Sequence, residues 1–509
     1  MEAPTNLLAQ RQFKLAALKQ RGFDPYPHKF DQTHTIGEIR AAFGALAGPE
    51  LGQKKENVRI CGRIMSLRPH GKAGFLDLSD GAQKLQVYVR RDSVDEKSYE
   101  LFQLMDLGDI AGAEGTLFRT RTNELTLLAV RLEHLAKNLV PLPEKWHGLT
   151  DVEIRYRQRY VDLIVSPGVR DIFVKRSRIV REVRSFLDDH GYLEVETPVL
   201  QPIAGGALAR PFITHHNALD LELYLRIALE LYLKRLIVGG LSRVYELSRI
   251  FRNEGISTQH NPEFTMLEFY QAYSDYRDLM DLTQSLSTTI AEKVTGTRQV
   301  PYQGDILDFD RWHRYSMREA IVRFWPESPA KPAPADFESL ENLRALARSV
   351  EAPFELTDGR GKLQAAIFEA VAEPHLIQPT FIYDYPTEVS PLSKTKPGDP
   401  ETVERFELYI AGMEIANAYS ELNDPLEQRA RFEEQLRARG MGDETAHVMD
   451  EDYIRALNYG MPPTAGEGIG IDRLTMVLTD TRSIREVILF PLLRPEAEAV
   501  PRNEPADAP

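Results

Sequence analysis

The sequence predicts an α+β chain in which a small β-barrel precedes a larger antiparallel sheet flanked by helices. The barrel is predicted by five short strand-like segments between residues 58 and 136, separated by Gly, Asp and Asn turn residues. The sheet is predicted by residues 244–273, where two alternating runs flank a loop that contains Gly255, Asn261 and Pro262. One face of these two strands is apolar, so we expect helices to pack against it.

The composition is typical of a globular protein. Of the 509 residues, 42% are hydrophobic and 27% are charged, and this length suggests roughly three domains. No run is apolar enough to span a bilayer, and Arg11, Lys14 and Lys19 interrupt the apolar positions that a signal peptide would need. The single cysteine, Cys61, excludes an intramolecular disulfide framework and a cysteine-cluster zinc site. We therefore expect a cytoplasmic protein.

The charge balance argues against general coating of nucleic acid, because the formal net charge is −14. A local basic surface is still compatible with this value. Arg11, Lys14, Lys19 and Arg21 fall within one short helix-like run, which is a candidate for such a surface.

The five barrel strands are short and apolar or alternating. They are "VRICGRIMSL", "AGFLDLSD", "KLQVYVRRD", "GTLFRTRT" and "ELTLLAVRLEHL". Five such strands in a small region favour an OB-fold, a barrel that binds oligonucleotides on one face. An SH3-like barrel or half of a β-sandwich would leave the same pattern, so the strands alone do not decide between these folds.

The remaining patterns divide the chain. A proline-containing linker leads from the barrel into charged helical segments, a helix over 169–190 ends at Gly191, and a strand follows over 192–200. We predict a first domain over residues 1–145, with a helix before the barrel, and a second over 146–494. The second carries a Pro/Ala-rich surface insertion around 326–360, and residues 495–509 form a flexible tail.

The strand over 263–272 places ionisable and aromatic groups on one face. Phe264, Met266, Glu268 and Tyr270 share this face, while Leu267 and its neighbours point the other way. A solvent-facing sheet surface is the commoner cause of such a pattern. The choice between a surface and a site depends on the other motifs.

A second stretch, "RFELYIAGMEIANAYSELND", predicts two strands joined by a turn at Gly412, with Glu407 and Glu414 on either side. Two carboxylates held together repel each other unless a proton or a cation lies between them. Oxygen ligands of this kind favour Mg²⁺, with phosphate completing the shell. After the turn, Asn417 and Glu421 share one strand face with Tyr419 and with the apolar Ile415.

Two glycine-rich stretches complete the set. The stretch "GGALARPFITHHN" reads as a loop. The stretch "TAGEGIGIDRLTMVL" has neither the glycine spacing of a dinucleotide-binding motif nor the ending of a P-loop. Its glycines predict a strand that is closely approached by backbone or ligand, followed by a helix that starts near Arg473.

Together these motifs resemble a known family. "ETPVL", "FRNE…HNPEF" and "GIGIDR" resemble the three ordered motifs of class II aminoacyl-tRNA synthetases. "RYRQRYVDL", "RPFITHHNALD", "HNPEFTMLEFYQAY" and "NAYSELNDP" are similar to the lysyl branch of bacterial type. The resemblance extends from about residue 8 to residue 494, and its strength lies in the motifs occurring together and in order.

The resemblance implies an ATP site with Mg²⁺. Arg252 would hold the α-phosphate and the amino-acid carboxylate, and Arg473 would sandwich adenine against Phe264, which makes both arginines the catalytic candidates. Glu407 and Glu414 would hold the Mg²⁺ that bridges the triphosphate. The ATP-binding candidates are Arg252, Glu254, His260, Asn261, Phe264 and Arg473.

The resemblance also implies an amino-acid pocket and an anticodon site. Glu421 and Tyr270 would lie near the ε-ammonium of lysine, and Glu230 near its α-amine. The lysine-binding candidates are Gly206, Glu230, Glu268, Tyr270, Asn417, Tyr419 and Glu421. The anticodon-binding candidates on the barrel are Phe75, Gln86 and Glu124, with Lys14 and Lys19 at nearby phosphates.

The implied activity is formation of lysyl-adenylate from L-lysine and ATP, followed by transfer of lysine to the 3′ end of tRNA(Lys), in a homodimer. An aspartyl or asparaginyl enzyme is an alternative, but it would need a cation or an amide facing the distal end of its substrate, and Glu421 argues against it. A non-enzymatic tRNA-binding relative would lack Arg252, Arg473 or the Mg²⁺ carboxylates, and all are present. Four positions depart from the family pattern, namely Leu229, Gln259, Ala416 and Ala418.

Overall fold

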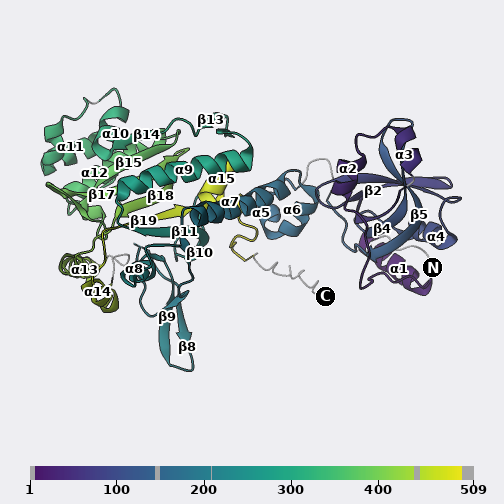
Figure 1. Cartoon of the computed structure of the whole chain (residues 1–509), viewed down its shortest axis with the longest axis horizontal. Coiled ribbons are helices and arrows are strands. Elements are labelled where there is room, and N and C mark those ends of the chain that lie inside the picture. The colour runs from purple at the N-terminus through teal and green to yellow at the C-terminus, as the bar shows by residue number, and fades with distance from the viewer. Residues whose placement is uncertain are drawn as a thin grey trace, which may run out of the picture. The chain divides into compact units, whose positions relative to one another are not determined.

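The computed structural model describes residues 6–54, 56–143, 149–207, 209–328, 330–440 and 448–495, without the side chains of 438–440. The chain forms two compact units that meet between Asp171 and Ile172, within helix α7 (Val169–Asp189) (Figure 1). The domain boundary predicted at residue 145 and nearly all of the predicted tail lie outside the described residues.

The first unit contains the predicted five-stranded barrel. Its strands are β1 (Asn57–His70), β2 (Ala73–Ser79), β3 (Lys84–Arg90), β4 (Ile110–Arg119) and β5 (Leu125–Ala136). They close in the order β1-β2-β3-β5-β4. Alternate residues of each strand, such as Ile60, Val87 and Leu127, point inward and are fully buried. The predicted barrel is therefore confirmed, and the residues between these positions form its outer surface.

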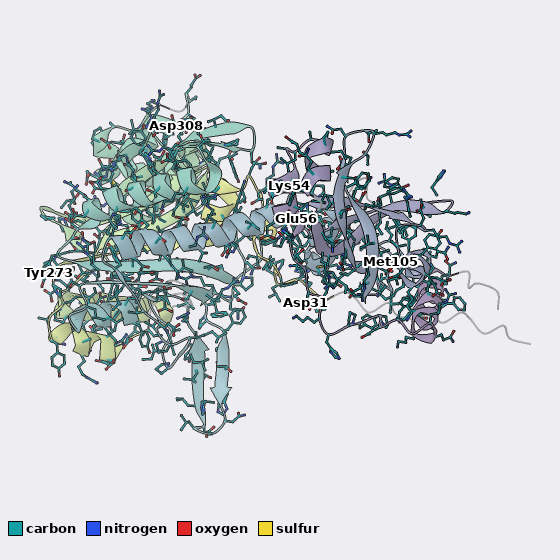
Figure 2. All side chains as sticks on the ribbon, turned by 45° about the vertical axis from the view of Figure 1, so that its right-hand side comes forward. Asp31, Lys54, Glu56, Met105, Tyr273 and Asp308 are labelled. Carbon is teal, nitrogen blue, oxygen red and sulfur yellow. The ribbon has the colours of Figure 1, made fainter. Side chains whose placement is uncertain are left out.

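Helices pack on the barrel, namely α1 (Leu7–Gln20), α2 (Ile36–Phe43), α3 (Gly48–Lys54) and α4 (Glu96–Leu104). Two further helices, α5 (Val152–Arg157) and α6 (Arg159–Val165), follow the barrel in the chain. Helix α2 begins at a capping box, in which the Thr35 hydroxyl accepts from the Glu38 backbone N–H and the Glu38 carboxylate accepts from the Thr35 N–H at 2.7 Å. Leu18 of α1 and Met105, which follows α4, are buried in the barrel core (Figure 2).

The second unit is built on one large sheet. Its main strands run in the order β14 (His313–Ser316), β15 (Thr380–Pro386), β17 (Asp399–Ile410), β18 (Met413–Ser420), β19 (Thr464–Gly470), β11 (Glu263–Ala272), β10 (Arg243–Phe251) and β6 (Leu193–Glu194), and β16 (Thr395–Lys396) pairs with β17. The central strands are antiparallel, while β14 and β6 add parallel pairs at the two edges. The predicted antiparallel sheet is thus confirmed at its centre.

Helices cover both faces of this sheet. Leu267 and Phe269 of β11 pack in one cluster with α7 and with α9 (Tyr276–Thr295), which cross the strands in Figure 1. Tyr270, from the opposite face, packs in another cluster with α8 (Glu230–Val238) and α14 (Glu451–Asn458). The alternation of the β11 sequence therefore determines which of its side chains meet each helical layer.

The predicted insertion is helical and packed. It contains η1 (Pro334–Glu338) and α11 (Leu340–Ser349), which share a buried cluster with α10 (Met317–Phe324) and α12 (Arg360–Val371). The cluster includes Tyr409 of β17, so the insertion is anchored on the sheet.

The remaining elements are short. They are β7 (Leu200–Gln201), β8 (Ile213–His216), β9 (Leu221–Leu225), β12 (Gln299–Tyr302), β13 (Asp305–Asp308), η2 (Glu373–His375), η3 (Thr387–Val389), α13 (Pro425–Gly440), α15 (Ile471–Leu478) and α16 (Ile484–Val487). The single strand predicted over 192–200 is instead split into β6 and β7. Pro198 lies between them and has no N–H to donate to a strand ladder.

Within the described ranges, no helix combines the length and the apolar character needed to cross a membrane.

The exposed Tyr273 directly follows β11 and has a positive φ of 62° (Figure 2).

Candidate active site

The polar face of the β10–β11 hairpin is buried. The two strands pair with Glu246 opposite Glu268 and Ser248 opposite Met266. Glu268 is 4% exposed and Tyr270 is 3% exposed. The interpretation of this face as a solvent-facing surface is therefore wrong, and it is instead the floor of a site.

Two cavities share this floor and meet at Arg252. The first, which we call the acidic cavity, has a volume of about 220 Å³. The second, the neighbouring cavity, has a volume of about 230 Å³. Arg252, Met266, Asn417 and Gly468 line both.

The structure groups the predicted residues by cavity. The acidic cavity is lined by the lysine-binding candidates Gly206, Glu230, Glu268, Tyr270, Asn417 and Tyr419. The neighbouring cavity is lined by the ATP-binding candidates Arg252, Glu254, His260, Asn261, Phe264 and Arg473, and by Glu414. Residues that are far apart in the sequence therefore form two adjacent compartments, as a reaction between two bound substrates requires.

Arg252 lies directly beyond the end of β10, one residue past the strand on which the sequence placed it. Its backbone N–H donates to the Pro262 carbonyl at 2.9 Å, and its Nε donates to the Ile227 carbonyl at 3.3 Å. Its guanidinium lies 5.3 Å from the centre of the Phe264 ring. These contacts fix the arginine where the two cavities join.

Arg473 is held in the neighbouring cavity from the start of α15. It donates to the Glu414 carbonyl at 2.6 Å, and its Nη2 lies 3.1 Å from Nε2 of His260. The Asn261 side chain donates to the Glu263 carbonyl at 2.6 Å, while its Oδ1 is buried with no hydrogen-bond donor among the described residues. A buried acceptor without a donor in a cavity wall indicates a place for a ligand group.

Carboxylates dominate the acidic cavity. Glu268 accepts hydrogen bonds from the Leu229 backbone N–H at 2.9 Å and from the Tyr270 hydroxyl at 3.2 Å. Burial, together with the charge of Glu230, raises the pKa of Glu268 to about 7 against these donors. The departure at Leu229 contributes here, because a proline at this position would have no N–H to donate.

Glu421 is the one lysine-binding candidate that is not a wall residue of the acidic cavity. It lies behind Gly466, where an added Cβ would come within 2.3 Å of Glu421 Oε1 and 2.2 Å of Tyr270 Cε1. Glycine at this position keeps the space between the carboxylate and the tyrosine open. Through its other oxygen, Oε2, Glu421 contacts the ammonium of Lys234.

Glu407 and Glu414 flank the predicted turn, where Ala411 and Gly412 have φ values of 56° and 69°. Burial and the charge of Glu407 raise the pKa of Glu414, and Arg473 opposes this shift. Glu407 itself accepts from the hydroxyls of two tyrosines at 2.8 and 2.6 Å. The charge of Glu407 therefore acts on Glu414, and their joint role as metal ligands stays a prediction.

Sequence reasoning missed two groups beside this pair. Arg405 joins Glu407 to Asn417, and its Nε donates to the Asn417 side chain at 3.0 Å. Burial and neighbouring carboxylates raise the pKa of Glu373 to about 7. The period-two spacing of Arg405 and Glu407 predicts that both lie on one strand face, so it could have identified Arg405. No such pattern could identify Glu373, which lies far away in the sequence. Among the described residues, no three His, Cys, Asp or Glu side chains are placed to hold a metal ion.

The barrel carries its candidates on its outer surface. Phe75 of β2 stacks on Tyr88 of β3, with ring centres 4.5 Å apart, and Tyr88 lies 6.2 Å from Phe118. Gln86 accepts from the Thr126 hydroxyl at 3.0 Å. The prior that most barrel phenylalanines belong to the core does not hold for Phe75, which is only partly buried. Sequence reasoning missed Tyr88 and Phe118.

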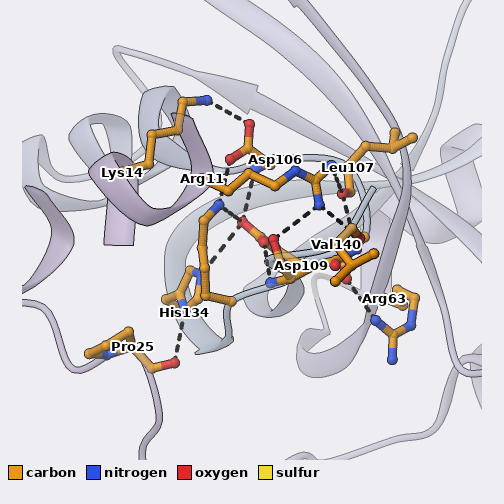
Figure 3. A network of polar contacts seen from close by, with 12 residues as sticks. Arg11, Lys14, Pro25, Arg63, Asp106, Leu107, Asp109, His134 and Val140 are labelled. Carbon is orange, nitrogen blue, oxygen red and sulfur yellow. Dashed lines mark hydrogen bonds and ion pairs between the residues drawn. The ribbon is translucent and has the colours of Figure 1, made fainter. Parts of the chain in front are cut away.

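Two charged candidates of the first unit, Glu124 and Lys14, are already paired within the protein. Glu124 accepts from Arg40 at 3.2 Å. Lys14 donates to Asp106 at 2.6 Å, as Figure 3 shows. This ion pair competes with the phosphate contact expected of Lys14.

The comparisons with known proteins agree with this arrangement. The family described as "tRNA synthetases class II (D, K and N)" matches residues 151–494, and the family "OB-fold nucleic acid binding domain" matches residues 58–135. The chain belongs to the class II tRNA synthetases, which are ligases, and its barrel is an OB-fold. The family and fold predicted from the sequence motifs are both confirmed.

Within this class, the chain is similar to lysine–tRNA ligases. It is 55% identical to that of Moorella thermoacetica over 98% of this chain and 100% of the relative. It is 55% identical to that of Carboxydothermus hydrogenoformans over 96% of this chain and 98% of the relative. It is 51% identical to that of Bacillus subtilis over 96% of this chain and 97% of the relative.

Proposed function

We propose that the protein is a lysine–tRNA ligase that forms lysyl-adenylate and pyrophosphate from L-lysine and ATP, then transfers lysine to the 3′ end of tRNA(Lys). The observation that carries this proposal is the junction of the two cavities at Arg252, with the acidic cavity on one side. A substrate with two ammonium groups suits a cavity rich in carboxylates. A buried ammonium without a carboxylate would be strongly penalised.

The two substrates would meet at Arg252. Its guanidinium would bind both the lysine carboxylate and the α-phosphate, with Asn417 as a second donor to the carboxylate. The carboxylate oxygen attacks the α-phosphorus, and pyrophosphate leaves. Arg252 stabilises the charge that develops in this transition state. A ribose hydroxyl of the tRNA then attacks the lysyl carbonyl, and AMP leaves.

The adenine of ATP would stack between Phe264 and Arg473, and both residues line the neighbouring cavity. Glu254 would contact the adenine side of ATP, and His260 and Asn261 would contact its phosphates. The buried Asn261 Oδ1, an acceptor without a donor, supports a ligand hydroxyl or amino group at this point, since a phosphate oxygen cannot donate to it. No side chain has to act as a nucleophile, so catalysis rests on positioning and electrostatics.

We propose Mg²⁺ at Glu407 and Glu414. Their chemistry fits, because the mutual repulsion and burial that raise the pKa of Glu414 would be relieved by a cation. Nucleotide phosphates would supply the ligands that the two carboxylates do not. When bound, Mg²⁺ offsets negative charge on the leaving pyrophosphate.

We propose that the barrel binds the anticodon through Phe75, Gln86 and Glu124, with Tyr88 extending the stacking surface. The support is the aromatic stack on the outer strands rather than in the core. Residues 1–145 would form this anticodon-binding domain, and residues 146–494 the catalytic domain.

We propose that two copies form a homodimer in the cytoplasm. Strand β6 is an edge of the main sheet, and β8 and β9 form a hairpin that projects from it (Figure 1). Exposed apolar side chains lie on these elements and at β7, which pairs with β9, namely Leu193, Val199, Leu200, Ile213, Leu219 and Leu221. Analytical ultracentrifugation tests this state, and a monomer at micromolar concentration would contradict it.

The function is tested by ATP–pyrophosphate exchange with each of the twenty amino acids in turn, followed by charging of tRNA. We expect exchange with L-lysine far above exchange with any other amino acid. Exchange driven by aspartate or asparagine would replace the proposal with the alternative enzyme, and the absence of exchange would replace it with a tRNA-binding protein.

A further inference from the structure

Lys234 is buried beside the acidic cavity, although no role follows for it from the proposed reaction. It lies on α8, one turn after Glu230, and its side chain is 0% exposed. Its ammonium contacts the carboxylates of Glu230 and Glu421. The rings of Tyr419 and Tyr453 lie 5.5 and 6.0 Å from Nζ. This cation is therefore in contact with carboxylates and aromatic rings.

The two carboxylates depend on Lys234 to different extents. Glu230 also accepts from the Tyr419 hydroxyl at 2.7 Å. Apart from Lys234, Glu421 has no hydrogen-bond donor and no ion-pair partner among the described residues. Burial raises the pKa of Glu421 well above its ordinary value, and Lys234 opposes that shift. Lys234 therefore favours the charged form of this carboxyl, although burial outweighs it.

The charges around the acidic cavity leave one negative charge when all groups are ionised. Four carboxylates, Glu230, Glu268, Glu421 and Glu467, and three cations, Lys234, Arg252 and Arg405, line this cavity or lie directly behind its wall. L-Lysine carries two ammonium groups and one carboxylate, so its net charge of about +1 balances that remainder. A diamine that lacks the carboxylate carries two positive charges, one more than the remaining negative charge of the cavity.

We propose that Lys234 is a positioning and specificity-determining residue, a resident ammonium that holds the Glu421 carboxylate in place and limits the acidic cavity to one added positive charge. This inference rests on the proposed lysine specificity. The substrate ε-ammonium would reach Glu421 past Gly466, from the side opposite Lys234. Glu421 would then lie between two ammonium groups, one from the protein and one from the substrate.

The alternative is that Lys234 only fills and stabilises the core. The variant Lys234→Met distinguishes a role of the charge from a role in packing, because methionine has a similar length without the charge. A matched control is Lys137→Met, which removes another fully buried ammonium from a pair of carboxylates in the first unit. We expect Lys234→Met to raise the KM for lysine at least about tenfold, with the KM for ATP changed less than about twofold. Lys137→Met should leave both values unchanged.

Charge selectivity gives a readout that packing does not affect. 1,5-Diaminopentane has the two ammonium groups of lysine but no carboxylate, so it tests the charge limit as an inhibitor of lysine-dependent exchange. We expect its Ki to fall at least about tenfold in Lys234→Met, because the cavity then has one more uncompensated negative charge. An unchanged or higher Ki, or a lysine KM within twofold of the parent, would overturn the role of Lys234.

If Lys234→Met does not fold, Lys234→Ala with added propylammonium replaces it. This cation restores the deleted atoms, and 1-propanol is its uncharged equivalent. Recovery of lysine affinity with propylammonium alone supports the proposal, while equal recovery with 1-propanol, or none with either, contradicts it. Exchange by the parent protein distinguishes the role of Lys234 from the proposed function. If the parent shows no lysine-dependent exchange, the proposed function itself is refuted.

Discussion

Two buried lysines, one in each unit, differ in how completely their carboxylate partners are bonded. Lys137 and Lys234 both have side chains that are 0% exposed, and each contacts two carboxylates. Around Lys137, Asp109 also accepts from the backbone N–H groups of Asp106 and Asn138, each at 2.8 Å (Figure 3). Around Lys234, Glu421 has no such donor among the described residues.

The pKa values follow this difference. Burial raises the pKa of Asp109, but His134, Lys137 and the Asn138 N–H outweigh it, and the net shift is downward. Burial of Glu421 outweighs Lys234, and the net shift is upward. A buried ion pair with all its bonds formed is part of the framework, whereas one with a bond missing marks a place where a ligand completes the network.

The comparison predicts that damage to the complete network affects stability alone. Asp109→Asn breaks a buried pair with several partners, so it should lower the free energy of unfolding of the first unit by about 3–5 kcal/mol. Urea unfolding followed by circular dichroism measures this loss. Lysine-dependent exchange below the unfolding transition should keep its parent KM, and a raised KM would show that the two regions are coupled.

Arg252→Ala should have the opposite effect. Arg252 lies where the two cavities join, and of its guanidinium nitrogens only Nε donates a hydrogen bond to a described residue. We expect a loss of about 10²–10³ in the rate of exchange, because a group that stabilises transition-state charge is removed. Unfolding by urea should be close to that of the parent. Exchange at the parent rate would exclude Arg252 from the reaction.

The barrel surface predicts a smaller and more selective effect. Phe75→Ala should weaken tRNA binding by about 1–3 kcal/mol, because one base stack is lost. Charging of tRNA should fall accordingly, while amino-acid-dependent exchange is spared. Glu124→Ala should show the same separation of the two assays. Equal losses in both would mean that Phe75 acts through the fold of the barrel.

The pH dependence of lysine recognition tests the acidic cavity. Because burial raises the pKa of Glu268 to about 7, this carboxyl keeps its proton at lower pH and cannot pair with an ammonium. The KM for lysine should therefore rise as pH falls below about 7, by at most about tenfold per pH unit. Leu229→Pro removes one N–H donor from Glu268, so it should move this rise to higher pH. A flat profile between pH 6 and pH 8 would contradict the assignment.

Much of this arrangement could be predicted from local patterns. The alternation over 263–272 gave both the strand and the two faces, because Leu267 and Phe269 pack in the core. Gly412 gave the turn that places Glu407 near Glu414. Such signals are local, since each depends on the period of one strand or on the conformation of one turn.

The role of Lys234 could not be predicted in this way. Its spacing from Glu230 is that of an ordinary surface pair on a helix. Burial of the pair follows from the packing of α8 against β11 and α14, which no short window contains. Tyr88 was missed for a related reason, because an aromatic residue on a barrel strand has the same period whether it faces the core or the solvent.

The most direct test of this account is calorimetric titration of L-lysine into the parent protein and into Glu421→Gln, which keeps the shape and removes the charge. A charged hydrogen bond contributes about 1.5–3 kcal/mol, so binding of lysine should weaken by roughly 10–150-fold while binding of ATP is retained. Lysine binding by Glu421→Gln as tight as by the parent would show that the incomplete network around Lys234 is not the lysine site.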